Sequence, residues 1–276
     1  MIDDPAGRID YAETGEGPAM VLVPGSCSTG AAWRQVMAAL GGRFRFVTTS
    51  LLGYGGTAER RTASDPAISH EAEALEAVIR RAGGPVHLVG HSFGGLVSLV
   101  VALRGRVPLE TLTIMEAPAI ELLREAGEHD HYRAFGEMSQ AYLAAFHDGE
   151  REAVSRMIDF YNGAGTFASW PQRVRDYLVE TTPANILDWA SAYGYTPSPA
   201  ALGALRIPVL IVCGGATHPA MQRANALLSG HIKGSALVTI PGAAHFMIST
   251  HPADVAAAIA DHVAPGVDLL HPRTEQ

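Results

Sequence analysis

Gly90, Ser92 and Gly94 form the pattern Gly-x-Ser-x-Gly, which is the most specific chemical signal in the sequence. The pattern lies between an expected buried strand, residues 86–89, and an expected helix that begins near Gly94. A serine on such a strand-to-helix turn adopts a positive φ and needs small neighbours two residues away on either side. The helix N-terminus behind it favours negative charge that develops there. The motif therefore predicts Ser92 as a nucleophile; the alternative is a glycine-rich turn whose serine caps the helix.

The motif and its context resemble the α/β-hydrolase superfamily, and the resemblance covers nearly the whole chain. The segment 21–26, Val-Leu-Val-Pro-Gly-Ser, lies where that family has its oxyanion loop, although Pro24-Gly25 stands in place of the usual His-Gly. The family's oxyanion donors are backbone N–H groups, so the missing histidine side chain need not abolish the site. By position, the resemblance implies that the N–H groups of Ser26 and Phe93 form the oxyanion hole.

The same resemblance assigns the base to His245 among the twelve histidines. His245 follows the expected last strand through Pro-Gly-Ala-Ala and precedes an expected helix that opens at Pro252. In the family the catalytic histidine occupies this last strand-to-helix loop. His251, beside Pro252, is the main competitor and is expected to begin the helix. Five others, which lie in polar helical or tail contexts, are set aside: His129, His131, His147, His262 and His271.

The acid cannot be assigned to its usual position. Most family members carry it in the loop 216–219, but that loop reads Ala-Thr-His-Pro here and contains no carboxylate. No Asp or Glu occurs between Asp188 and Asp254. One strand earlier, Glu116 closes the expected strand 112–115 at the sheet edge where ligands bind. Haloalkane dehalogenases and lactonases that open zearalenone place the acid there. We therefore predict that Glu116 holds the His245 tautomer; the alternative is a charged strand end that faces solvent or pairs with an arginine.

The elements that must position these residues alternate between short apolar runs and helix-like segments, which is typical of βαβ units around a parallel sheet. A hairpin over residues 8–23 that turns at 15–17 is expected to open the sheet. The expected strands, rich in Val, Leu and Ile, are 19–23, 44–48, 86–89, 112–115, 209–212 and 237–240. The expected helices between them are 31–40, 69–82, 94–104, 219–228 and 252–263. The prediction is an α/β-hydrolase fold with a mostly parallel eight-stranded sheet flanked by helices.

The alternation stops over residues 119–203, which read as purely helical, with expected helices at 132–146, 150–161, 172–180 and 186–193. This stretch holds 85 residues and 12 of the 19 aromatic residues. We interpret it as a helical cap inserted into a core of residues 1–118 and 204–276; the alternative is ordinary packing of helices onto the sheet. Trp170, Trp189 and Tyr161 are candidate substrate-binding residues.

The amino-acid composition disfavours some classes of binding partner. The formal charge is −8 and Lys233 is the sole lysine, so no basic surface favours nucleic acid. The stretch 86–103 is interrupted by polar residues and glycines and is a poor membrane span. The acidic N-terminus shows no signal-peptide pattern. Cys27 and Cys213 are far apart and are expected to be reduced thiols in a cytoplasmic protein, with Cys27 lining the oxyanion loop.

These residues predict a serine hydrolase that cleaves a carboxylic ester or lactone of a small, largely apolar molecule through an acyl-enzyme. No metal or other cofactor is expected, because His218 and His231 lack ligand spacing. The alternatives are C–C bond or amide hydrolysis, or a cofactor-free lyase or perhydrolase, with the same three residues. A different class is a non-catalytic receptor for a small molecule, which a fluorophosphonate probe would leave unlabelled. The expected partner is a small-molecule substrate, and a homo-oligomer stays open.

Overall fold

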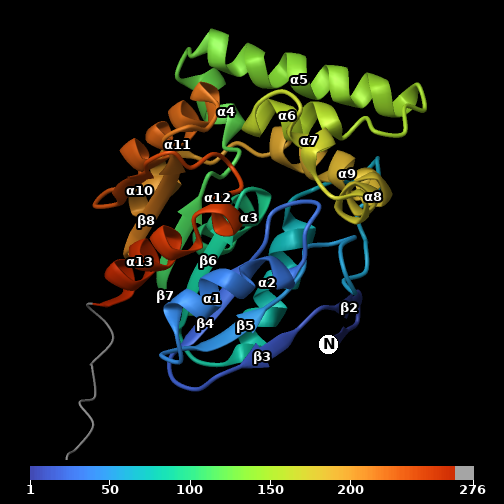
Figure 1. Ribbon diagram of the computed structural model, residues 1–276. Helices are drawn as coiled ribbons and strands as arrows, with labels where there is room; N and C mark the ends of the chain where they lie inside the picture. Colours follow the sequence, from blue (N-terminus) through green and yellow to red (C-terminus); the bar gives the residue numbers. More distant parts are fainter. Residues whose placement is uncertain (265–276) are drawn as a thin grey trace, which may run out of the picture.

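The computed structural model describes residues 1–264, which form a twisted sheet with helices on both faces and a further helical layer above one edge (Figure 1). The strand order in the main sheet is β3-β5-β4-β6-β7-β8-β9. Every neighbouring pair is parallel except β3 with β5. The strands are β3 (Ala12–Thr14), β4 (Ala19–Val23), β5 (Arg45–Thr48), β6 (Val86–His91), β7 (Leu109–Met115), β8 (Val209–Gly214) and β9 (Ala236–Ile240).

The N-terminal strands differ from the expected arrangement. Over residues 1–264 the main sheet has seven strands, because β1 (Ile2–Asp4) and β2 (Gly7–Ile9) pair only with each other. The hairpin expected over residues 8–23 is wrong, since β3 pairs with β5 rather than with β4. The three residues of β3 are all exposed, which suits the sheet edge, whereas all five residues of β4 are buried and need a neighbour on each side.

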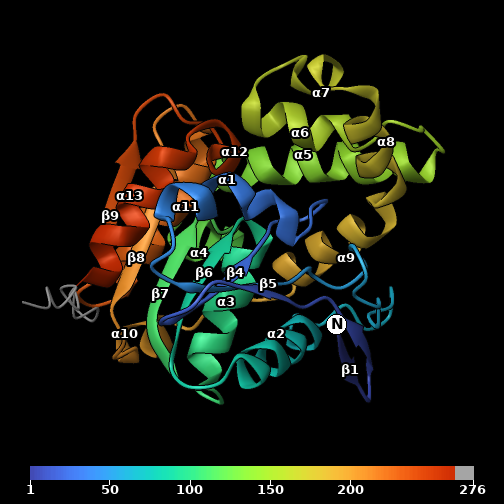
Figure 2. The ribbon, with the colours of Figure 1, turned by 60° about the horizontal axis from the view of Figure 1, so that its bottom comes forward.

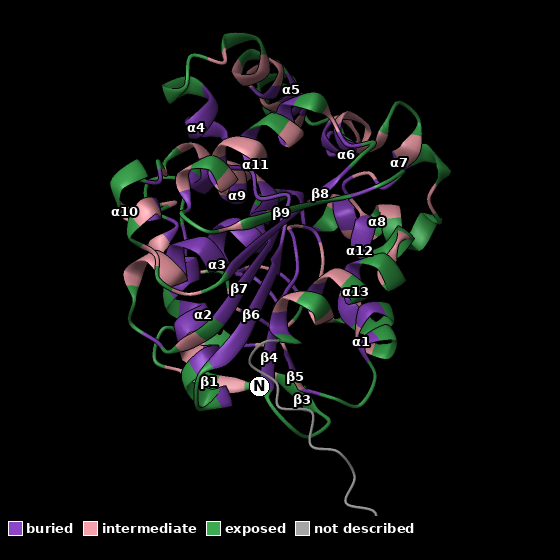
Figure 3. Ribbon diagram, turned by 90° about the vertical axis from the view of Figure 1, so that its left-hand side faces the viewer, coloured by how far each residue is buried: buried purple, intermediate pink, exposed green. Residues whose placement is uncertain are grey.

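Alternating side chains of the strands pack into two separate cores, one on each face of the sheet. Val21 of β4 belongs to one core, which includes residues of α2 and α3. Its neighbour Met20 belongs to the other core, with residues of α1 and α13. Figure 3 shows the central strands buried between these layers. Because each central strand packs against a core on both faces, its position in the sheet is fixed. The position of the loop that follows its carboxyl end is therefore fixed as well.

The helices of the core confirm most of the expected ranges, with a short 3-10 turn (Gly30–Trp33) ahead of α1. α1 contacts α13 on one face of the sheet, and α2 contacts α3 on the other (Figure 2). No helix within residues 1–264 is long and apolar enough to cross a membrane. The core helices are α1 (Arg34–Leu40), α2 (Ser69–Ala82), α3 (Phe93–Arg104), α11 (Pro219–His231), α12 (Met247–Thr250) and α13 (Pro252–Val263).

The segment between β7 and β8 is entirely helical, as its sequence indicates. α5 to α8 lie above the sheet, and α9 runs back toward the core, where it contacts α3 and α4 (Figure 1). The helix expected over 150–161 begins later, at Ser155, after a turn. The helices are α4 (Ile120–Glu125), α5 (His129–His147), α6 (Ser155–Asn162), α7 (Thr166–Ser169), α8 (Gln172–Glu180), α9 (Thr182–Tyr193) and α10 (Pro199–Ala204).

Two of the expected domain boundaries lie at the C-terminal end of the cap and at the C-terminal end of the core. α10 contacts α11 and leads directly into β8, so we define the cap as α4 to α9. The expected core range ended at residue 276, but residues 265–276, and with them His271, lie outside the described part of the chain.

Candidate active site

Ser92 lies on a sharp turn between β6 and α3, with φ 54° and ψ −128°. The two glycines of the motif permit this turn because other backbone comes very close to them. A Cβ added at Gly90 would come 2.5 Å from the carbonyl oxygen of Gly94, and one added at Gly94 would collide with the carbonyl oxygen of Pro24. The turn thus has the geometry that the Gly-x-Ser-x-Gly pattern predicts, with Ser92 above the carboxyl edge of the sheet.

Positive φ angles at non-glycine residues gather at this edge. Within the described residues 1–264, three such residues occur: Cys27 at 55°, Ser92 at 54° and Glu116 at 47°. Each follows the carboxyl end of one of three adjacent strands, β4, β6 and β7. Strained backbone of this kind persists only where surrounding contacts hold it, and it is concentrated at functional sites. The positive φ angles therefore indicate the same edge of the sheet as the Gly-x-Ser-x-Gly motif.

His245 connects Ser92 to Glu116, although the three residues come from distant parts of the chain. It lies in the loop between β9 and α12, and the Nε2 atom is 2.9 Å from Ser92 Oγ. Its Nδ1 atom is 2.6 Å from Glu116 Oε2. The Nδ1–H of His245 donates a hydrogen bond to the carboxylate, which leaves Nε2 free to accept one from the Ser92 hydroxyl. The structure thus brings together the predicted nucleophile, base and acid in one hydrogen-bonded chain.

Glu116 is fully buried, and three donors besides His245 hold it in place. The Gly214 N–H donates to Oε1 at 2.7 Å, and the Thr217 hydroxyl donates to Oε2 at 3.0 Å. The Cys213 thiol lies 3.8 Å from Oε1. Burial on its own would raise the pKa of Glu116, but hydrogen bonds from His245 and Gly214 and the charge of His245 outweigh it and lower that pKa. Glu116 is therefore a carboxylate, and its burial excludes the alternative of a strand end that faces solvent.

The imidazole ring of His245 is held between two other rings. Tyr161 of α6 stacks on it, with ring centroids 4.1 Å apart and an angle of 14° between the planes. The ring of His91 lies 4.9 Å away, and the His91 Nε2–H donates to the carbonyl oxygen of His245 at 2.7 Å. Burial and the nearby His245 lower the pKa of His91 to about 3, so His91 stays neutral. The two rings restrict rotation of the His245 side chain.

The expected oxyanion donors, the N–H groups of Ser26 and Phe93, come from two different segments of the chain. Ser26 belongs to the loop that follows β4, and Phe93 is the first residue of α3. Within residues 1–264 neither N–H donates to a protein acceptor. Both residues line the same cavity as Ser92, which an oxyanion hole formed by their N–H groups would require.

A cavity of about 580 Å³ opens above Ser92 between the sheet edge and the cap. This volume is in the range of small-molecule sites. Tyr161, Trp170 and Trp189, the three candidate substrate-binding residues, all contribute to its wall. So do Met157, Ile158, Leu178 and Phe246, and the wall above the candidate nucleophile is therefore largely apolar. His251 also lines the cavity but immediately precedes α13, while His245 alone contacts Ser92.

A comparison with models of known protein families identifies the family to which this chain belongs. The model described as "Alpha/beta hydrolase family" matches residues 20–258. The chain belongs to the α/β-hydrolase family. This α/β-hydrolase is 27% identical to the polyketide synthase ThaQ of Burkholderia thailandensis over 265 residues, which are 91% of this chain and 12% of ThaQ. It spans 33% and 35% of the lengths of other curated relatives.

Solved structures of other α/β-hydrolases share the fold at low identity. A thermophilic esterase from Thermogutta terrifontis superposes with a TM-score of 0.72 and 21% identity, covering 94% of each chain. The enol-lactonase from Burkholderia xenovorans LB400 gives a TM-score of 0.71 and 18% identity, covering 94% of this chain and 98% of the other. The mostly parallel sheet flanked by helices, expected from the sequence, is thereby confirmed.

Sequence reasoning missed several residues that shape this α/β-hydrolase site. Thr217 belongs to the loop that lacks a carboxylate, and its hydroxyl donates a hydrogen bond to Glu116, which directly follows β7. A polar residue in that loop was an available signal. Asp188 also lines the cavity and pairs with Arg61, 127 positions away. Its signal was weaker: a single acidic residue in the apolar stretch Ile-Leu-Asp-Trp-Ala of α9.

Proposed function

We propose that the protein is a serine hydrolase that cleaves a carboxylic ester or lactone of a small, largely apolar substrate through an acyl-enzyme. The observation that carries the proposal is the hydrogen-bonded chain from Ser92 through His245 to Glu116, which ends in a cavity beside two unpaired N–H groups. An esterase and an enol-lactonase share this fold, and their reactions belong to the class proposed here.

The geometry supports a definite order of proton movements. The Ser92 hydroxyl attacks the carbonyl carbon while its proton passes to Nε2 of His245, 2.9 Å away. Glu116 stabilises the resulting imidazolium through Nδ1, and the N–H groups of Ser26 and Phe93 stabilise the oxyanion. The imidazolium then protonates the leaving alcohol, and water, activated by the same histidine, releases the acid and free Ser92.

Covalent labelling tests the proposal. An alkyl fluorophosphonate should add its phosphonyl group to Ser92, lose fluoride and abolish hydrolysis of 4-nitrophenyl butyrate. Mass spectrometry of the digested protein would locate the adduct. Absence of labelling and of hydrolysis across a panel of esters and lactones would overturn the proposal and favour a receptor of the same fold.

The cavity wall predicts which substrates are preferred. Tyr161, Trp170 and Trp189 face the space above Ser92, and Asp188 adds a buried acidic group to its wall. Aromatic or medium-chain esters and lactones should therefore exceed small charged esters, such as half-esters of dicarboxylic acids, by at least about tenfold in kcat/KM, because apolar burial favours the former and charge repulsion opposes the latter. Hydrolysis of methyl hexanoate and of monomethyl succinate, which share a leaving group, provides the measurement. A preference for the charged series would contradict the prediction.

Cys27 offers an alternative nucleophile, which the structure argues against. The thiol is buried, and its burial together with the negative charge of Asp188 raises the pKa of Cys27 to about 12. A protonated thiol is a poor nucleophile. We expect Cys27→Ala to retain kcat within about threefold, because alanine and cysteine meet the same strain at a positive φ. Loss of activity as severe as in Ser92→Ala would overturn the assignment of Ser92.

A further inference from the structure

One face of cap helix α9 borders the cavity above Ser92. Asn185, Asp188, Trp189 and Ala192 all line that cavity, and their spacing of three, four and seven positions places them on the same side of the helix. Asn185 and Asp188 carry polar side chains, yet each residue exposes no more than 2% of its surface. A buried polar group is stable only when it is hydrogen-bonded, so the partners of these side chains show which groups are free for a ligand.

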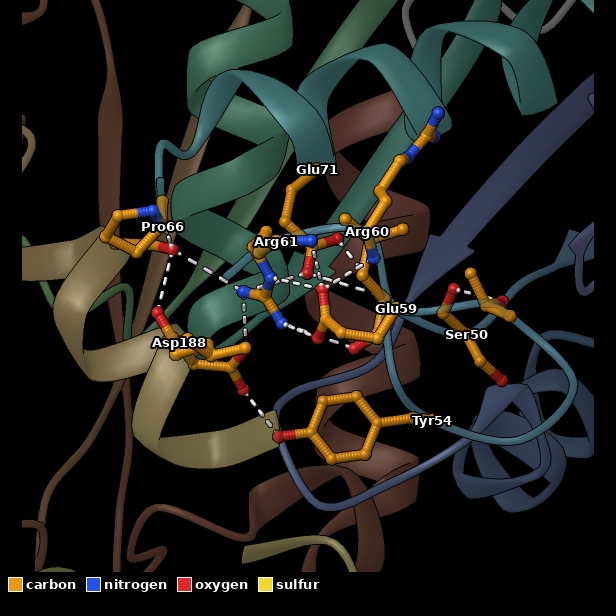
Figure 4. A network of polar contacts seen from close by, with 12 residues as sticks. Ser50, Tyr54, Glu59, Arg60, Arg61, Pro66, Glu71 and Asp188 are labelled. Carbon is orange, nitrogen blue, oxygen red and sulfur yellow. Dashed lines mark hydrogen bonds and ion pairs between the residues drawn. The ribbon is translucent and has the colours of Figure 1, made fainter. Parts of the chain in front are cut away.

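The polar groups of Asp188 and Trp189 have partners within the protein. Figure 4 shows the Asp188 carboxylate, whose Oδ1 atom accepts from Nη1 of Arg61 at 2.8 Å and whose Oδ2 atom accepts from the Tyr54 hydroxyl at 2.6 Å. The Arg61 side chain is fully buried in the segment between β5 and α2, so this ion pair anchors α9 to the core. The indole N–H of Trp189 donates to the sulfur of Met157 at 3.3 Å. These two residues therefore offer a ligand no free donor.

The amide of Asn185, in contrast, has a protein partner at one end only. Its Oδ1 atom accepts a hydrogen bond of 3.0 Å from the hydroxyl of Tyr142, a fully buried residue of α5. A buried hydroxyl needs an acceptor for its proton, so this contact fixes which end of the amide faces Tyr142. The Nδ2 atom carries two N–H groups, and neither donates to a protein group within residues 1–264. This nitrogen is not sealed inside the protein, and the space that Asn185 lines is the cavity.

Another buried asparagine shows how an amide with a purely structural role is paired in this fold. Asn225 of α11 accepts from the Ala117 N–H at 3.1 Å, and its Nδ2 atom donates to the carbonyl oxygens of Ala117 and Met221 at 3.2 and 3.0 Å. Asn225 does not line the cavity. Both ends of its amide are thus used, whereas the NH2 group of Asn185 is left for an acceptor that enters the cavity.

The charges near Asn185 determine which kind of acceptor suits this donor. Among the described residues, no lysine or arginine lines the cavity. Asp188 lies one turn further along α9, and its partner Arg61 is shared with Glu59 and Glu71. A carboxylate or phosphate on the substrate would therefore meet a negative group with no lysine or arginine in the wall to offset it. A neutral oxygen, such as that of a ketone, ether or alcohol, accepts from an N–H group without this repulsion.

We propose that Asn185 is a specificity-determining residue whose Nδ2–H groups bind a neutral oxygen acceptor of the substrate, separate from the ester group that Ser92 attacks. The inference rests on the proposed function, in which the N–H groups of Ser26 and Phe93 take the carbonyl oxygen of that ester. It narrows the substrate class to largely apolar esters or lactones that also carry a ketone, ether or hydroxyl oxygen. A site built in this way discriminates against the analogue that lacks the acceptor, because the buried donor is then left unpaired.

Esters with and without a second oxygen test the proposal. Methyl heptanoate is compared with methyl 4-oxo-, 5-oxo- and 6-oxoheptanoate, which place a ketone at three distances from the same scissile bond, and kcat/KM is measured for each. The wild type should prefer at least one keto ester over methyl heptanoate by about 10–100-fold, and Asn185→Leu should lower that ratio by at least about tenfold. Because the ratio is compared between two proteins, the intrinsic reactivity of each ester cancels.

Asn162→Leu is the matched control. Asn162 of α6 also lines the cavity, but its Nδ2 atom donates to the carbonyl oxygen of Ile158 at 3.2 Å. The same change of side chain removes no free donor there, so the preference for the keto ester should stay within about twofold of wild type. Retention of the preference in Asn185→Leu, or an equal loss of it in both variants, would overturn the inference.

The melting temperature is measured for both variants, because Asn185→Leu leaves the Tyr142 hydroxyl without its acceptor. Should that variant not fold, the double variant Asn185→Leu/Tyr142→Phe removes both hydrogen-bonding partners and should show the same loss of preference. Wild-type protein that hydrolyses methyl heptanoate but prefers none of the keto esters would overturn the inference and leave the proposed function standing. Wild-type protein that hydrolyses none of the esters and does not react with an alkyl fluorophosphonate would overturn the proposed function, and this inference with it.

Discussion

Ser92→Ala should lower kcat for ester hydrolysis by about 10⁴–10⁶, since removal of the nucleophile leaves only the rate enhancement from binding and the oxyanion donors. Ser92 Oγ is the atom that faces Nε2 of His245, at 2.9 Å. Alanine has the same backbone requirements as serine at φ 54°, and the flanking glycines are unchanged, so the turn should keep its shape. Hydrolysis of 4-nitrophenyl butyrate and far-ultraviolet circular dichroism provide the two measurements.

Ser64→Ala is the matched control, because Ser64 is an exposed serine that does not line the cavity above Ser92. It should retain wild-type kcat and label with the fluorophosphonate, whereas Ser92→Ala should not label. Activity of Ser92→Ala within tenfold of wild type, with a normal dichroism spectrum, would remove Ser92 from the mechanism.

The fold could be predicted closely wherever one physical signal acts alone. The strand 19–23 and the helices 69–82 and 252–263 have the expected bounds, since a continuous apolar run or a helical apolar stripe is decided by local sequence. The pairing of β3 could not be predicted in this way. Residues 12–14 carry no apolar pattern that would indicate their partner. They pair with β5 along the side of that strand that faces away from β4.

The residues of the candidate site also fall into two groups: those that a local sequence pattern predicts and those that only the folded chain brings together. Ser92 could be predicted because its turn requires glycines at fixed spacing, and Glu116 because the loop 216–219 offers no carboxylate. The Arg61–Asp188 pair could not, since no spacing rule joins residues 127 positions apart. Its existence depends on how the cap is seated, which is a tertiary property. The stacking of Tyr161 on His245 has the same origin, because α6 and the loop after β9 meet only in the folded chain.

Thr217 and Gly214 show why the acid can occupy β7 in this chain. Both belong to the β8 end, where the resemblance to other family members would place a carboxylate, and both donate to Glu116 instead. The positive φ at Glu116 turns its backbone at the carboxyl end of β7. An acid at this position therefore combines a glutamate directly after β7 with donors rather than acceptors at and after the end of β8. A carboxylate restored at position 217 would face Glu116 and repel it.

Glu116→Gln should lower kcat by at least about 10²-fold with little change in KM, because an amide in place of a triad acid can cost about 10⁴. The surrounding donors determine how the amide must lie. The Gly214 N–H, whose nitrogen is 2.7 Å from Oε1, can donate to the amide oxygen but not to the NH2 group, so the NH2 group must take the place of Oε2. There it faces Nδ1 of His245 at the 2.6 Å contact and donates to it. His245 then carries its proton on Nε2 and can no longer accept the proton of Ser92.

The rival interpretation makes Glu116 a structural charge, and stability measurements distinguish the two. The folded-state pKa of Glu116 is lowered, so its charge stabilises the fold above the unfolded-state pKa, and this contribution is lost as the pH falls through the lowered value. Glu116→Gln lacks this contribution, so its loss of stability relative to wild type should be largest near neutral pH and should shrink in acid. Glu121→Gln, a change at a buried glutamate that contacts Arg124 outside the site, is the matched control and should keep its kcat. If Glu116→Gln lowers the melting temperature but keeps a kcat near wild type, Glu116 does not belong to the mechanism and Ser92 and His245 act as a dyad.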